Sequence, residues 1–205
     1  MCLNGGDIML YEYMKSLGYN DKEIDKIRNA YIFRKYSEIG LYNKVSDIFN
    51  YLLSFGYSHD DIIKITVCLP TVYGFSVDTI NERLMDMIKL GYTKEEIIIM
   101  TRKMPSLFGR NIDDIRLKKR FYDKLNIGDI IIKSPIHLSQ SIELSFARYV
   151  FYHRMGIKID RGNANMLFMK QDLFISKFGK TNEQLMKLYN YDEYLEKRKA
   201  KLKKK

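Results

Sequence analysis

The sequence predicts an all-α protein built from repeated helical pairs. The same residue types return at fixed offsets from each of the three prolines, and the apolar residues between them follow helical spacing. The composition agrees, because 205 residues with 46% hydrophobic side chains and only 12 glycines can bury a sizeable core. We therefore expect a folded chain in which consecutive helical pairs pack side by side.

The second helix of each pair is bounded at both ends. Six residues after each proline stands a good N-cap residue, and two residues further on an acid suited to the first helical turn. A base follows thirteen residues after the proline, and a residue tolerant of the left-handed conformation that ends helices follows twenty-one after it. In that order these residues are Ser76, Asp78, Arg83 and Gly91 after Pro70; Asn111, Asp113, Lys118 and Asn126 after Pro105; and Ser141, Glu143, Arg148 and Gly156 after Pro135.

The first helix of each pair starts with a capping signal and ends at the proline, which removes a backbone donor and crowds the preceding turn. Two pairs of residues have the capping-box spacing, namely Ser58 with Asp61 and Thr93 with Glu96. Only nine residues separate Asn126 from Pro135, so the fourth unit should have a shortened first helix. An upstream copy at residues 17–23 has no proline after it, and we expect it to be degenerate, as terminal repeats often are.

A helical pair of this kind cannot bury its apolar face alone, so consecutive pairs must share one core. The residues just before each helix end should form it: Leu52, Leu53, Phe55, Met87, Ile88, Leu90, Tyr122, Leu125, Phe151, Tyr152 and Met155. The residues three after each proline, Tyr73, Phe108 and Leu138, should anchor the proline turn by packing their side chains into this core. Cys68 lies in an apolar run, where we expect a buried filler.

The charge is distributed unevenly along the chain. Residues 1–101 hold 11 Lys or Arg against 14 Asp or Glu, residues 102–196 hold 17 against 11, and residues 197–205 add seven bases. This asymmetry is typical of a polyanion binder with a directed face, although a solvated face with a solubilising tail accounts for it as well. The expected organisation is an N-terminal helical cap (1–50), the repeats (51–158), a C-terminal helical cap (159–196) and a basic tail (197–205).

Signals for enzymatic chemistry are absent from the sequence. The histidines His59, His137 and His153 lack the i, i+4 pairing of a helical metal site, and no phosphate-binding or dinucleotide-binding fingerprint occurs. We expect no catalytic residue, no metal, no cofactor and no enzymatic activity. With no long apolar stretch and no leader-like N-terminus, we also expect no membrane contact and a cytoplasmic location.

The repeating unit reads as Leu or Phe, Gly, an aromatic residue, Ser or Thr, acids, Ile-Ile, then Pro and a capped helix. Residues 52–70 and 88–105 carry this pattern most fully, and residues 135–156 form a related copy. The pattern resembles the repeat of the mTERF (mitochondrial transcription termination factor) family, and the likeness covers roughly residues 50–190, with a poor fit over the first fifty.

The resemblance implies a right-handed α-solenoid with a positively charged concave groove that binds nucleic acid, either duplex DNA or RNA, and has no catalytic machinery. It places the bases thirteen after each proline on or near that groove, with other bases around them. The expected contact residues are Arg83, Lys103, Arg110, Lys118, Lys119, Arg120, Arg148, Arg154 and Lys158. The alternative is an adaptor or inhibitor that binds a partner protein on the solenoid surface. We expect a monomer.

Overall fold

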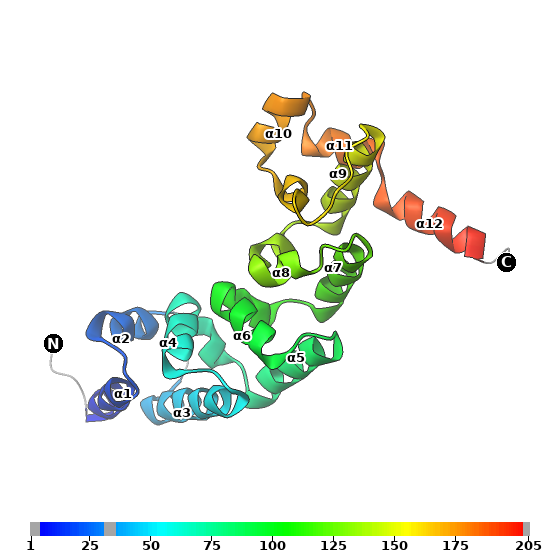
Figure 1. Ribbon diagram of the computed structural model, residues 1–205. Coiled ribbons are helices and arrows are strands. Elements are labelled where there is room, and N and C mark those ends of the chain that lie inside the picture. The colour runs from blue at the N-terminus through cyan, green and yellow to red at the C-terminus, as the bar shows by residue number, and fades with distance from the viewer. Residues whose placement is uncertain (1–4, 31–35, 203–205) are drawn as a thin grey trace. The chain divides into compact units, whose positions relative to one another are not determined.

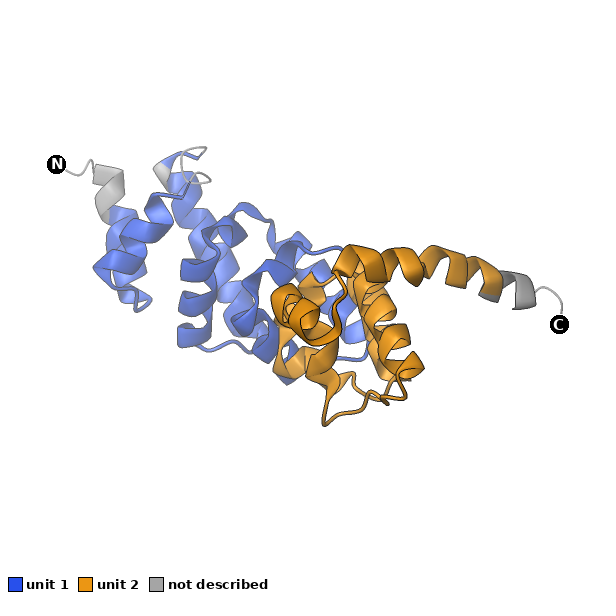
Figure 2. Ribbon diagram, turned by 90° about the horizontal axis from the view of Figure 1, so that it is seen from above, with its two compact units in different colours: residues 1–112 blue, residues 113–205 orange. Residues whose placement is uncertain are grey.

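The computed structural model describes residues 5–30 and 36–202, and all regular structure within these ranges is helical. This confirms the predicted all-α fold class. The chain forms two compact units, residues 1–112 and residues 113–205 (Figure 2).

The first unit contains two rows of helices. The first helices of the pairs, α2, α4 and α6, contact one another in sequence, and so do the second helices, α1, α3 and α5 (Figure 1). The first row comprises α2 (Asp21–Arg28), α4 (His59–Cys68) and α6 (Lys94–Lys103). The second row comprises α1 (Gly5–Ser16), α3 (Glu38–Phe55) and α5 (Val77–Lys89). The stacking of consecutive pairs lets each pair bury an apolar face against the next.

Both prolines of this unit act as predicted. Each begins a short 3-10 helix, η2 (Pro70–Gly74) and η3 (Pro105–Gly109), directly after the helix that it stops. The residues before them, Leu69 and Met104, have nearly identical backbones, with φ of −131° and −141°. Such extended φ values follow from the steric clash between a proline ring and the residue before it.

The caps also form as predicted. Capping boxes with both reciprocal hydrogen bonds start α4, between Ser58 and Asp61, and α6, between Thr93 and Glu96. Gly91 follows the C-terminal end of α5 with φ of +92°, a conformation that glycine adopts at little cost. The upstream copy, which no proline follows, also has the cap that its sequence indicates, because α2 starts with a complete capping box between Asn20 and Glu23.

Buried hydroxyl groups link consecutive pairs in this unit. The Tyr57 hydroxyl lies 2.8 Å from Thr101 Oγ1 on the first helix of the next pair. The equivalent hydroxyl of Tyr19 lies 2.7 Å from Thr66 Oγ1 and 2.7 Å from the Tyr73 hydroxyl, and burial raises the pKa of Tyr19 to about 12. Each threonine stands four residues before its proline, and a buried hydroxyl of this kind needs the partner that the neighbouring pair supplies.

The second unit continues the pattern with shorter elements. The interval before Pro135 forms a helix of only five residues, α8, which confirms the predicted shortening. The helix α9 lies at the centre of the unit and contacts η5, α11 and α12. The elements are α7 (Ile112–Lys124), α8 (Asp129–Lys133), η4 (Pro135–Ser139), α9 (Ile142–Arg154), η5 (Ala164–Phe168), α10 (Gln171–Phe178), α11 (Asn182–Leu188) and α12 (Tyr191–Leu202). Asn126 and Gly156 end α7 and α9 with φ of +57° and +74°, as predicted.

Eight of the fourteen predicted core residues are buried, among them the three that follow the prolines, Tyr73, Phe108 and Leu138, and five more are half-buried. Two expectations are wrong. Met155 is 51% exposed because it lies at the C-cap of α9, beyond the last turn that packs inward. Cys68 is exposed because it lies one helical turn after the exposed Lys64, on the solvent face of α4.

Candidate nucleic-acid interface

The bases thirteen residues after Pro105 and Pro135 lie inside the protein. Lys118 is 3% exposed, and its Nζ donates to the Leu138 carbonyl at 2.7 Å and to Asp114 at 2.8 Å. Arg148 is 1% exposed, and its Nη1 donates to the Leu167 carbonyl at 2.9 Å. Both acceptors are the fourth residue of a 3-10 helix, in η4 and η5 respectively. These bases therefore hold the next repeat in place and present no charge at the surface, contrary to the expected groove position.

Arg148 is further enclosed by two contacts. Its Nη2 donates to Asn182 Oδ1 at 2.8 Å, and its guanidinium carbon lies 4.9 Å from the centre of the Phe174 ring. Burial lowers the pKa of Arg148. The equivalent base in the first unit, Arg83, is only half-buried, and its Nε is buried without a hydrogen-bond partner among the described residues.

The other expected contact residues lie nearer the surface. Lys119 is half-buried and forms an ion pair with Asp123 at 2.7 Å, whereas Arg120 and Lys158 are exposed. Arg154 is exposed, with its guanidinium carbon 5.1 Å from the centre of the Tyr189 ring. In the first unit, Lys103 is exposed in the last turn of α6, and Arg110, which follows η3, is half-buried.

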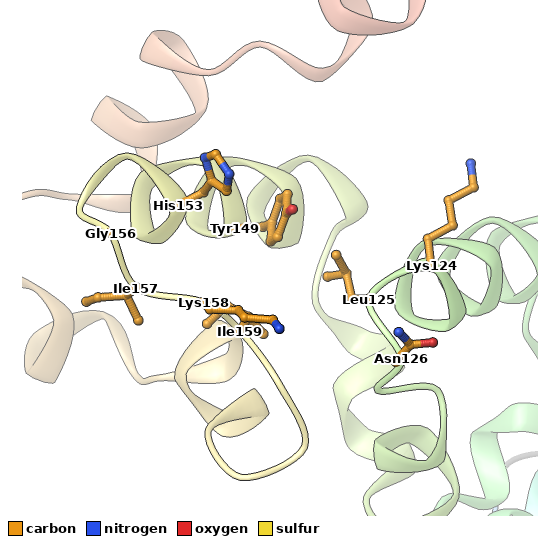
Figure 3. A pocket seen from close by; sticks show the side chains of 9 residues that line it. All are labelled: Lys124, Leu125, Asn126, Tyr149, His153, Gly156, Ile157, Lys158 and Ile159. Carbon is orange, nitrogen blue, oxygen red and sulfur yellow. The ribbon is translucent and has the colours of Figure 1, made fainter.

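A pocket of about 480 Å³ brings one expected residue, Lys158, together with several that sequence reasoning missed (Figure 3). We call it the basic pocket. Tyr149 and His153 line it from α9, with ring centres 6.1 Å apart, and Lys158 comes from the segment after that helix. Its other lining residues are Lys124, Leu125, Asn126, Gly156, Ile157 and Ile159. Arg161, with 76% of its side chain exposed, lines a depression that shares Lys158 with this pocket.

The sequence does contain a signal for Lys124. It stands nineteen residues after Pro105, and the same offset from the other two prolines gives Lys89 and Arg154. All three side chains are exposed, unlike the buried bases at offset thirteen in the second unit. We call Lys89, Lys124 and Arg154 the exposed basic series. A base in the last helical turn also complements the negative end of the helix dipole, so this position has a structural use too.

An aromatic cleft of about 390 Å³ lies beside the basic pocket in the same unit and shares Lys124, Leu125 and Tyr149 with it. Its remaining lining comes from α7, α9 and α12. The residues are Leu117, Arg120, Phe121, Phe146, Tyr191, Tyr194 and Leu195. The cleft thus combines aromatic rings with two exposed cations, Arg120 and Lys124.

The whole net charge of the protein belongs to the unit that contains both cavities. Residues 1–112 hold 14 Lys or Arg and 14 Asp or Glu, whereas residues 113–205 hold 21 against 11. Of the basic tail, residues 203–205 lie outside the described residues. An excess of this size attracts polyanions over several ångströms and is screened by salt.

In the described part of the chain, no group of three or more His, Cys, Asp or Glu side chains could hold a metal ion. Within the same residues, none of the helices combines the length and the apolar character needed to cross a bilayer.

The fold and its surface define a class: an all-α helical-repeat protein with a cationic second unit. The family model of mTERF matches residues 11–175, and the chain belongs to this family, whose members are generally nucleic-acid-binding, non-enzymatic helical-repeat proteins. The match starts at residue 11, which corrects the expectation that the first fifty residues fit the family poorly. No curated protein matches the sequence.

Proposed function

We propose that this protein binds nucleic acid through the exposed cations in and around the basic pocket of the second unit, with a role in transcription or RNA handling. The observation that carries the proposal is the basic pocket, where Lys124 and Lys158 line one cavity with Tyr149 and His153. Lysine ammonium groups supply phosphate contacts, and a tyrosine hydroxyl and an imidazole add hydrogen-bonding groups.

The contact set differs from the one that the sequence indicates. Lys118 and Arg148 are left out because their donors are engaged in the interior. Arg120, Arg154 and Lys158 stay in the set. Lys124 joins it as a member of the exposed basic series, and Arg161 joins it because it is exposed and lines a depression together with Lys158. Backbone phosphate contacts of this kind provide affinity without sequence choice.

A salt titration with charge-matched variants tests this proposal. One variant carries Lys124→Gln, Arg154→Gln and Lys158→Gln, and its control carries Lys133→Gln, Lys177→Gln and Lys187→Gln, three exposed lysines that line neither cavity. Both lose the same net charge, so general electrostatics changes equally.

Binding to labelled duplex DNA, single-stranded DNA and RNA is followed by fluorescence anisotropy. Each lost phosphate contact lowers the slope of log K against log salt by about 0.7–0.9, so the first variant should lose about 2.1–2.7 units of slope and its control almost none. Equal losses in both variants, or no binding by the unmodified protein at low salt, would refute the proposal. Removal of residues 197–205 in a further variant separates the contribution of the tail.

A further inference from the structure

The aromatic cleft has a chemistry that the basic pocket lacks. Phe146 lies against both aromatic residues at the start of α12, with ring centres 5.2 Å from Tyr191 and 4.8 Å from Tyr194. On the α7 side, Phe121 meets Tyr149 edge-on, with ring centres 6.1 Å apart and an interplanar angle of 86°. The cleft is therefore walled by aromatic rings from three helices.

Part of this apolar surface stays in contact with water. Tyr194 is 44% exposed and Leu117 is 38% exposed, whereas Phe146, which also lines the cleft, is only 7% exposed. Contact between exposed aromatic surface and water raises the free energy of the protein. The binding of a flat apolar ligand that covers these rings is therefore favoured.

The charges around the cleft determine which flat ligand is favoured. Arg120 and Lys124 line it, and no lining residue is acidic. Four acids adjoin lining residues in the sequence without lining the cleft themselves. Asp123 pairs with Lys119 at 2.7 Å and Glu193 with Lys197 at 2.5 Å, whereas Asp192 and Glu196 are exposed on α12. A ligand that suits this site has an aromatic plane with negative charge next to it, which describes a nucleobase joined to its phosphates.

We infer that the aromatic cleft binds an unstacked nucleobase, so that this protein prefers single-stranded nucleic acid to duplex. A base inside a duplex has both faces covered by its neighbours and cannot contact the rings, whereas a single strand can turn one base into the cleft. The adjacent phosphates then meet Arg120 and Lys124. The inference rests on the proposed function and adds the class of nucleic acid.

The experiment uses three probes of equal length, roughly 12 nucleotides, a span within the usual site sizes of single-strand binders. They are a thymidine strand, an abasic strand with the same sugar-phosphate backbone, and a hairpin duplex. The chain contains no tryptophan, so Tyr194→Trp introduces a single fluorescent reporter at an exposed position of the cleft. The thymidine strand should quench this indole and bind about 10-fold more tightly than the abasic strand, because stacking on an aromatic ring adds affinity of this order.

A second variant carries Tyr194→Leu, which lines only the aromatic cleft, and its matched control carries Tyr36→Leu, an exposed tyrosine of the first unit. The Tyr194→Leu variant should lose the preference for the thymidine strand and keep its salt dependence, while the control keeps both. Salt-dependent binding of all three probes with equal affinity and no quenching would overturn the inference and leave the proposed function intact. Binding of none of them would overturn both. Quenching by an oligoglutamate peptide as strong as that by the thymidine strand would overturn the inference in favour of an acidic protein segment.

Discussion

Replacement of Lys118 by methionine tests whether this lysine stabilises the fold or binds phosphate. Methionine keeps much of the apolar stem but leaves the Leu138 carbonyl without the donor that now lies 2.7 Å away. A hydrogen bond from a charged donor contributes about 1.5–3 kcal/mol. The ion pair with Asp114 adds little, because that carboxylate is a third exposed and therefore screened. The expected loss of unfolding free energy is thus about 2 kcal/mol.

For a chain of 205 residues, this loss corresponds to a drop in Tm of about 4–8 °C. Thermal unfolding followed by circular dichroism measures it, and anisotropy measures the salt slope of nucleic-acid binding for the same protein. Lys124→Met is the matched control, because this exposed lysine should affect stability by less than about 0.5 kcal/mol and lower the salt slope instead. An unchanged Tm for Lys118→Met together with a reduced salt slope would show that our account of this residue is mistaken.

Three further predictions concern stability. Gly91→Ala should cost about 1 kcal/mol, measured by urea unfolding, because φ is +92° and no neighbour crowds the added methyl group; an unchanged midpoint would argue against the left-handed backbone. A double-mutant cycle of Tyr57→Phe and Thr101→Val should give a coupling of about 1 kcal/mol, and a value near zero would mean that their 2.8 Å hydrogen bond contributes nothing. Burial lowers the pKa of His137, which stacks on Phe168 at 3.7 Å, so its neutral form is favoured in the folded state. Its contribution should be complete above about pH 6.5 and decline as pH falls below that value, which urea midpoints at several pH values test against a His137→Phe variant.

The elements that were predicted correctly depend on local chemistry. The capping box of Thr93 with Glu96, the stop at Pro105 and the left-handed Asn126 involve residues within a few positions of each other, so their spacing carries the information. The shortened helix before Pro135 followed from counting residues alone. The family assignment rests on the same spacings.

The candidate site was predicted less well because its residues depend on contacts between repeats. Sequence spacing places Lys118 at a regular offset but does not show that the carbonyl of residue 138 approaches it. A basic residue at such an offset is compatible with an exposed charge at the surface and with a buried hydrogen-bond donor, and the sequence does not distinguish the two. Lys124 occupies an offset just as regular, and its role becomes visible only when the pocket that it shares with Lys158 is known.

The concentration of net charge in residues 113–205 has a consequence for the folded state itself. Ten surplus positive charges within one unit repel each other and weaken it, whereas the first unit is balanced. A bound polyanion would neutralise this repulsion and so act as a folding stabiliser for that unit alone. Amide hydrogen exchange should then slow across α7 to α12 when ligand is added, and remain unchanged in α1 to α6.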